Sequence, residues 1–235
     1  MEKKNIENLF DNISKKYDIA NFFTSLGIEK YWRRKFTKHI IGNEKYVLDA
    51  CCGSGISTLN IVNKVKGSST QITGIDFSEE MLQVARQRVQ AITQKQGMPE
   101  IKFGTGDVCE LDCADSYFDL VTIVFGIRNV VDRAKALKEF YRVMRIGGKL
   151  VIMEFNYPKK PMLRKLYSFY MDRILVNIGG AITKNKNAYR YLVKTIKDFP
   201  TVEDFSTLIA SAGFSDITAE KLTMDTCTIF TALKK

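Results

Sequence analysis

The sequence lacks any Cys-x-x-Cys pair, although it contains five cysteines. An odd number of cysteines without paired spacing is typical neither of a disulfide framework nor of a zinc site. We therefore expect free thiols, no metal and a reducing, cytoplasmic location. The N-terminal residues contain no apolar segment typical of a signal peptide, and the longest apolar stretch, 118–127, is too short to span a membrane. These absences favour an ordinary globular protein of 235 residues.

Acidic residues are fewer than basic ones, 26 against 36, and the excess is concentrated in two segments. Residues 159–198 hold ten Lys or Arg against two acids, a net charge of +8, and residues 1–46 hold ten against six, a net charge of +4. Such a cationic surface suits the backbone of a nucleic acid or an anionic membrane, and a solvated helix face is the simpler alternative. Arg33 and Arg34 are expected on a solvated face of this kind.

Short apolar runs alternate with segments of helical spacing between residues 46 and 155. Strands are predicted over 46–51, 71–76, 101–103, 118–125 and 149–155, and helices over 57–66, 78–92 and 132–145. This βαβ alternation predicts an α/β fold with a doubly wound parallel sheet.

The flanking segments have other patterns. Residues 156–199 are mostly helical, with one face formed by Leu163, Leu166, Tyr167, Tyr170, Ile174 and Leu175. Two strands, 217–222 and 227–233, are too close together to enclose a helix and predict an antiparallel hairpin. We expect one domain over 1–235: an N-terminal helical lid (1–45), a core (46–155), a basic helical insert (156–199), and a C-terminal helix and hairpin (200–235).

Ligands of open α/β sheets bind at the carboxyl ends of the strands. Gly53 and Gly55 follow the first strand and permit close backbone approach, and Asp76 ends the second, where an acid can accept hydrogen bonds from ribose hydroxyls. A dinucleotide loop would need a third glycine at position 58, which is Thr58. The loop therefore favours a ligand with ribose and adenine but no pyrophosphate, such as S-adenosylmethionine. A nicotinamide-dependent oxidoreductase is the alternative on the same fold.

Motifs along the whole chain carry a family resemblance. They include Phe10-Asp-x-Ile13, Tyr17-Asp18-x-x-Asn21, Trp32-Arg-Arg34, Gly74-x-Asp76-Phe-Ser78, Phe125-Gly-Ile-Arg-Asn-Val130, Glu154-Phe155, Tyr189-x-Tyr-Leu192 and Phe199-Pro200. With these motifs the sequence resembles the UbiE/MenG/COQ5 family of quinone-biosynthesis C-methyltransferases. The resemblance implies the class I S-adenosylmethionine methyltransferase fold, with a doubly wound, mostly parallel sheet of seven strands.

The resemblance also implies cofactor residues. Thr58, Asp76, Asp107 and Val108 would contact S-adenosylmethionine: Asp76 would bind the ribose, Asp107 the adenine amine, and the Val108 N–H a ring nitrogen. Asp49, Gly53 and Gly55 would border the methionine end. Phe77 would stack on adenine or be a core aromatic, and Val124 stands where ubiquinone-type members often carry Ser. No metal is needed.

For the reaction, a quinol ring carbon must attack the sulfonium methyl group while the quinol loses a proton. Arg128 and Asn129 are expected to contact the quinol oxygens, with Arg128 stabilising the quinolate, and Tyr17 of the lid to complete the site. The implied substrate is a polyprenylated quinol, 2-demethylmenaquinol, and a methoxybenzoquinol of ubiquinone biosynthesis is the alternative. Val124 favours the first only weakly.

No proline is followed by Pro, Tyr or Cys, which argues against the Pro-Pro-Tyr and Pro-Cys motifs of enzymes that methylate nucleic-acid bases. We therefore expect no nucleic-acid partner. Because a prenyl quinol stays in the bilayer, the expected location is peripheral, at the inner face of the cytoplasmic membrane. A homodimer and a non-catalytic basic adaptor remain open alternatives.

Overall fold

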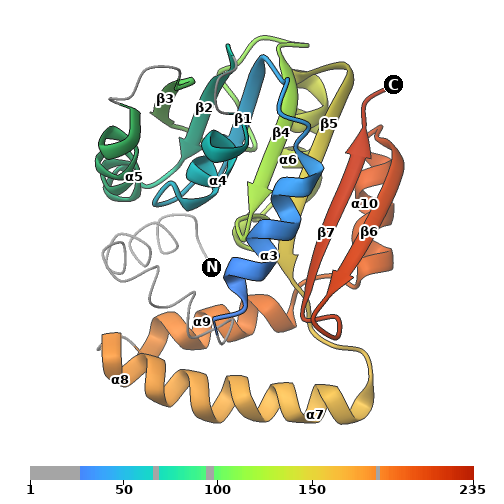
Figure 1. Cartoon of the computed structure of the whole chain (residues 1–235). Helices are drawn as coiled ribbons and strands as arrows, with labels where there is room; N and C mark the ends of the chain where they lie inside the picture. The colour runs from blue at the N-terminus through green and yellow to red at the C-terminus, as the bar shows by residue number, and fades with distance from the viewer. Residues whose placement is uncertain (1–26, 66–68, 94–97, 184–185) are drawn as a thin grey trace.

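The computed structural model describes residues 27–65, 69–93, 98–183 and 186–235. In this part of the chain, one sheet has the strand order β3-β2-β1-β4-β5-β7-β6 (Figure 1). Strands β1 to β5 pair in parallel, and β7 is antiparallel to both β5 and β6. The strands are β1 (Tyr46–Ala50), β2 (Gln71–Asp76), β3 (Glu100–Thr105), β4 (Phe118–Val124), β5 (Met144–Phe155), β6 (Ser215–Leu222) and β7 (Cys227–Leu233). The predicted sheet and its antiparallel hairpin are confirmed.

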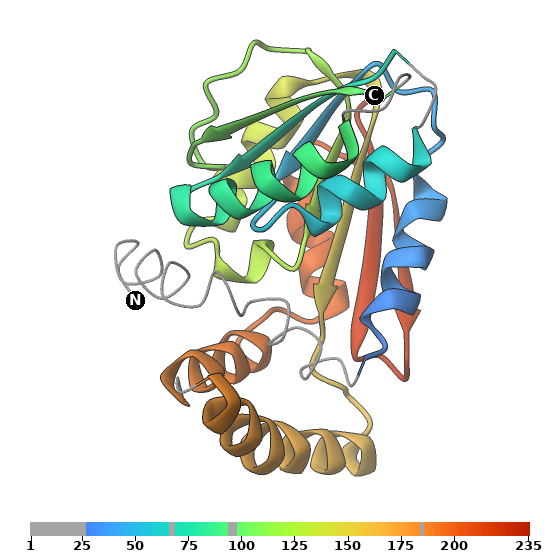
Figure 2. The same ribbon diagram turned by 60° about the vertical axis from the view of Figure 1, so that its left-hand side comes forward.

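Helices cover both faces of the sheet. One face carries α3 (Glu29–Phe36), the short 3-10 helix η2 (Thr37–His39), α4 (Ile56–Lys64) and α5 (Glu79–Thr93), and the other carries α6 (Arg133–Val143) and α10 (Val202–Ser211) (Figures 1 and 2). Two hydrophobic cores result, one on each face of β1, β4 and β5. Strand β4 is buried almost throughout because both of its faces are covered.

A layer of helices lies beyond the carboxyl ends of the parallel strands (Figure 1). It contains α7 (Pro161–Phe169), the π-helix η4 (Tyr170–Gly179), α8 (Gly180–Thr183) and α9 (Lys186–Lys197). Met171 and Leu175 are buried with Tyr189 and Val193 of α9, so the two arms of the insert share a core. No helix in the described residues is long and apolar enough to cross a membrane.

Two local predictions are wrong. The helix expected to reach residue 145 ends at Val143, because Met144 pairs with Phe118 and begins β5; the strand then passes through Gly147, whose φ of 79° suits glycine. In the insert, Leu166 and Ile174 were predicted to share one helix face with Leu175, but they are 65% and 38% exposed whereas Leu175 is buried. The π-helical turns of η4 shift Ile174 and Leu175 from the positions that α-helical spacing predicts. The predicted helix containing Tyr17 lies outside the described residues.

Candidate active site

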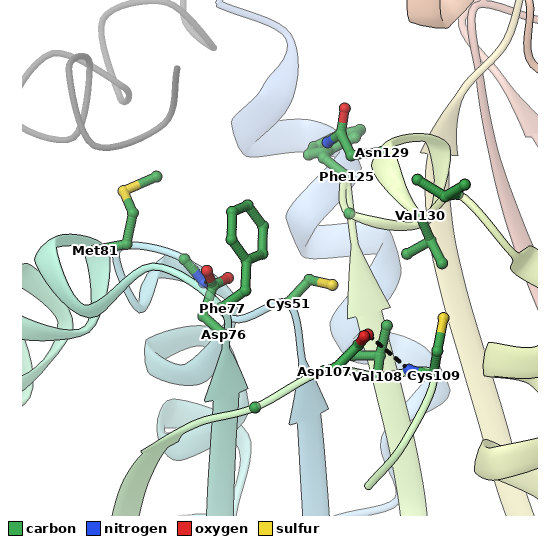
Figure 3. A pocket seen from close by; sticks show the side chains of 14 residues that line it. Cys51, Asp76, Phe77, Met81, Asp107, Val108, Cys109, Phe125, Asn129 and Val130 are labelled. Atoms are coloured by element: carbon green, nitrogen blue, oxygen red, sulfur yellow. Dashed lines mark hydrogen bonds between the residues drawn. The ribbon is translucent and has the colours of Figure 1, made fainter. Parts of the chain in front are cut away.

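A cavity opens at the carboxyl ends of β1, β2, β3 and β4 (Figure 3). Its lining comes from four loops that follow strands: Cys51, Gly53, Asp76, Phe77, Met81, Gly106, Asp107, Val108, Cys109, Phe125, Gly126, Asn129, Val130 and Val131. The cavity is therefore where the sheet topology predicts a ligand.

Asp76 is the acid at the end of β2 and is 5% exposed. Its carboxylate accepts the N–H of Gly53 at 2.8 Å and the N–H of Ser78 at 3.0 Å. Burial nevertheless outweighs these hydrogen bonds and raises the pKa of Asp76 to about 6. The ring of Phe77 stands in the cavity beside this carboxyl group (Figure 3). A half-buried ring in the cavity fits stacking on a ligand better than a place in the core.

Asp107 and Val108 line the cavity across from Asp76 (Figure 3). The Asp107 carboxylate accepts the N–H of Cys109 at 2.9 Å, which holds this short loop in a tight turn. Both Cys51 and Cys109 line the cavity, and burial raises the pKa of both thiols, to about 11 for Cys109. These thiols are protonated at neutral pH and are not poised as nucleophiles.

Asp49 lies beneath the glycine loop and is fully buried. Its carboxylate accepts the hydroxyls of Ser57 at 2.8 Å, Thr58 at 2.7 Å and Thr122 at 3.0 Å. Burial raises the pKa of Asp49, and the three hydroxyls act in the opposite direction. Asp49 and Thr58 do not line the large cavity; they brace the glycine loop from below, and their contact with the cofactor stays a prediction.

Gly55 also lines no described cavity, and its requirement for glycine is structural. Its φ is 79°, and an added Cβ would lie 2.9 Å from the Cβ of Ala85 on α5. Gly53 does line the large cavity and has a φ of 53°. The two loop glycines therefore serve different purposes: Gly53 borders the cavity, and Gly55 permits α4 to start against α5.

A smaller cavity adjoins the first and shares Cys51, Gly53 and Phe125 with it. Its other lining residues are Arg33, Cys52, Ser54, Ile56, Ser57 and Val124. Arg33 was expected in solvent but is only 8% exposed, whereas its neighbour Arg34 is exposed. The sequence singled out Arg33 only as part of the motif Trp32-Arg-Arg34, and nothing in that motif distinguishes the buried arginine from the exposed one.

Arg128 and Asn129 lie in the 3-10 turn η3 (Ile127–Asn129), which follows β4. The Arg128 guanidinium binds Glu154 at 2.9 Å, and both side chains are buried. Arg128 does not line the cavity; Asn129 does, and its Oδ1 is buried with no hydrogen-bond partner in the described structure. The structure thus separates two residues that the sequence grouped, and Tyr17, the third, lies outside the described residues.

The fold is that of the class I S-adenosylmethionine-dependent methyltransferases, and the cavity lies where this fold holds its ligand. Solved structures share the fold: an S-adenosylmethionine-dependent methyltransferase from Thermotoga maritima has a TM-score of 0.65 at 19% identity, covering 97% of this chain and 99% of that chain. Phosphoethanolamine N-methyltransferase 2 from Haemonchus contortus, in complex with S-adenosyl-L-methionine, has a TM-score of 0.62 at 18% identity, covering 87% and 52%.

The particular family follows from sequence comparison. The model of the ubiE/COQ5 methyltransferase family matches residues 1–234. A ubiquinone/menaquinone biosynthesis C-methyltransferase UbiE from Geotalea daltonii is 38% identical, covering 97% of this chain and 96% of the relative. A demethylmenaquinone methyltransferase from Bacteroides fragilis is 35% identical, covering 99% and 94%. The chain belongs to the ubiE/COQ5 methyltransferase family and uses S-adenosylmethionine, which excludes the oxidoreductase and adaptor alternatives.

Proposed function

We propose that this enzyme methylates a ring carbon of a polyprenylated quinol, converting 2-demethylmenaquinol to menaquinol. The observation that carries the proposal is the buried, unpartnered Oδ1 of Asn129 in the cavity wall, where it can accept a hydrogen bond from a quinol hydroxyl. A relative from Bacteroides fragilis is named for the demethylmenaquinone reaction, and others are named for both quinone pathways. A methoxybenzoquinol is the second candidate substrate.

The cavity residues fit S-adenosylmethionine, which supplies an activated methyl group. We assign the ribose hydroxyls to Asp76, the adenine to Asp107, Val108 and the face of Phe77, and the start of the methionine chain to Gly53. Asp49, Gly55 and Thr58 hold this loop in place, and Val124 borders the smaller cavity.

The quinol carbon becomes a nucleophile as the adjacent hydroxyl gives up its proton, so catalysis needs a positioned acceptor and stabilisation of negative charge. Asn129 positions the hydroxyl. Glu154 binds both the guanidinium and the backbone N–H of Arg128, behind the turn that carries Asn129. This fixes the position of Asn129, and the positive charge of Arg128 stabilises the quinolate electrostatically without contact. Tyr17 remains a proposed part of the lid.

The substrate is tested by supplying both demethyl quinols under reducing conditions and identifying the product by mass. Asn129→Leu, which has a similar volume but no acceptor, should lower kcat while the affinity for S-adenosylhomocysteine stays unchanged. Asn63→Leu, the same substitution at an exposed position of α4 that does not line the cavity, is the matched control. Methylation of only the methoxybenzoquinol would overturn the substrate assignment, and unchanged kcat in Asn129→Leu would overturn the role of Asn129.

We also propose that the insert docks on an anionic membrane surface, where a prenyl quinol resides. Five large apolar side chains are exposed along α7 and η4: Met162, Leu166, Phe169, Ile174 and Ile178. Successive members of this set are four, three, five and four residues apart. Steps of three and four keep side chains on one face of an α-helix, and the step of five, from Phe169 to Ile174, falls where the α-helix becomes a π-helix with more residues per turn. Arg164, Lys165 and Arg173 on the same elements are exposed and complement anionic lipid.

Vesicle co-sedimentation tests this docking. Leu166→Gln with Phe169→Gln should weaken binding to anionic vesicles by at least about tenfold, because each buried apolar side chain contributes about 1.5–3 kcal/mol. Ile41→Gln with Ile146→Gln, 71% and 78% exposed in the wild type, is the matched control.

The basic residues are tested in the same assay. Replacing Lys159, Lys160, Arg164 and Lys165 by Gln should abolish the preference for anionic over neutral vesicles, and salt should reduce it. Equal binding of wild type and the Leu166/Phe169 variant would refute docking through the apolar face. A dimer in solution that this variant converts to monomer would instead identify the face as a contact between two copies.

A further inference from the structure

Arg33 is a buried arginine beside the glycine loop. It projects from α3, its guanidinium lies 5.6 Å from the centre of the Phe125 ring, and its side chain is 9% exposed. Its Nε donates a hydrogen bond to Glu29, one turn earlier on the same helix. Its Nη1 is buried and has no hydrogen-bond partner in the described structure. A buried charged donor without a partner is costly, so its retention calls for a ligand.

The cavity that Arg33 lines reaches the first turn of α4. The first N–H groups of an α-helix have no partner within the helix, and the N-cap of α4, Gly55, has no side chain to supply one. Ile56 and Ser57 of this turn line the same small cavity as Arg33. Backbone N–H groups at a helix N-terminus and a guanidinium together favour an anion.

Acidic side chains of the described residues leave the Nη1 of Arg33 without a partner. Asp49 is a buried acid that feels the charge of Arg33, but its carboxylate accepts the hydroxyls of Ser57, Thr58 and Thr122. Glu29 occupies the Nε edge of the guanidinium and leaves the Nη edge available. Glu29 thus fixes the Nε of Arg33, and Nη1 remains available to a ligand in the small cavity that Arg33 lines.

The small cavity is continuous with the nucleoside site through Cys51, Gly53 and Phe125. A ligand whose ribose lies on Asp76 and whose chain passes Gly53 would next meet the cavity lined by Arg33. We infer that Arg33 and the first turn of α4 form a carboxylate subsite that binds the methionine carboxylate of S-adenosylmethionine. Anchoring both ends of the cosubstrate fixes the direction of the sulfonium methyl group toward the quinol.

The inference rests on the placement of the nucleoside at Asp76 and is independent of which quinol is methylated. It is tested by calorimetry with two ligands, S-adenosylhomocysteine and 5′-methylthioadenosine, which share adenosine and a thioether but of which only the first has a carboxylate. Arg33→Met should weaken the binding of S-adenosylhomocysteine by about 10- to 150-fold, the range for a hydrogen bond to a charged group, and leave the binding of methylthioadenosine unchanged. Arg34→Met, the exposed neighbour, should affect neither ligand.

Arg33→Lys provides a second measurement if Arg33→Met folds poorly. It keeps the charge but loses the planar fork, so the loss for S-adenosylhomocysteine should be smaller than in Arg33→Met and again absent for methylthioadenosine. Equal losses for both ligands would show that Arg33 only supports the cavity wall, and no loss for either would show that the carboxylate binds elsewhere. Either result overturns the inference. Wild-type protein that binds neither ligand would instead contradict the nucleoside site itself.

Discussion

Replacing Asp76 by Asn removes the charge of the carboxyl group that faces the cavity while keeping its size. In the wild type the carboxylate accepts two backbone N–H groups and has further lone pairs for ribose hydroxyls. The N–H groups of Gly53 and Ser78 bind different oxygens of the carboxylate, and Asn has only one acceptor oxygen, so its NH2 group would face one of these N–H donors and leave less acceptor capacity for the ribose. A hydrogen bond to a charged group contributes about 1.5–3 kcal/mol, so we expect the Kd of S-adenosylhomocysteine to rise about 10- to 150-fold.

The same carboxyl group gives the affinity a pH dependence. Because burial raises the pKa of Asp76 to about 6 in the free protein, the group is protonated at lower pH and must release its proton to accept the ribose hydroxyls. The wild-type Kd should therefore rise by about tenfold for each pH unit below this pKa. Asp76→Asn should show no such slope. For stability the sign is the reverse: protonated Asp76 favours the folded state, and this contribution is lost as pH rises from 3.8 to about 6.

Isothermal titration calorimetry across this pH range, with thermal unfolding to confirm that each variant is folded, measures both effects. Asp115→Asn is the control, because that carboxylate is 74% exposed and pairs with Arg142 on the surface. A folded Asp76→Asn variant with wild-type affinity would refute the ribose assignment. If that variant kept the acid-side slope, the titrating group would be a different residue.

The remaining predictions concern stability. Gly55→Ala should lower the free energy of unfolding by about 1–3 kcal/mol, because alanine is strained at a φ of 79° and its Cβ would lie 2.9 Å from the Cβ of Ala85. Chemical denaturation measures this loss, and Gly104→Ala is the control because an added Cβ there meets nothing within 4 Å. Glu154→Met leaves the Arg128 charge buried without its partner and should cost about 3–5 kcal/mol, whereas Arg128→Met with Glu154→Met should recover most of this loss. Equal stabilities of the single and double variants would contradict the importance of the ion pair.

The sheet was predictable because its signals are local in the sequence. Strand β4 is apolar on both faces and is covered on both, and the last two strands are too close for a helix between them, so they pair as a hairpin. The boundary at Met144 was not predictable, because it depends on pairing with Phe118, far away in the chain. The outward face of Ile174 was missed for a different reason: periodicity analysis assumes α-helical turns, and η4 is a π-helix.

The position of the site was predictable, but not which of its residues face the cavity. Asp76, Asp107 and Asn129 lie there as the strand ends suggested. The burial of Arg33 could not be predicted, since charged residues are usually solvated and Phe125, against whose ring its guanidinium lies, is distant in sequence. Arg128 carries a strong motif signal, yet its guanidinium is held by Glu154 on the neighbouring strand. Sequence spacing does not show which partner a side chain takes.

Three acids near the carboxyl ends of parallel strands differ in the partners that their carboxylates take. Asp49 of β1 is bound by three hydroxyls, and Glu154 of β5 by the guanidinium and N–H of Arg128 and by the N–H of Phe155. Both are fully buried, and neither lines the cavity. Asp76 of β2 is held only by backbone N–H groups at its edge of the cavity. The first two acids therefore fix the loops, and Asp76 retains the acceptor capacity that a ligand requires.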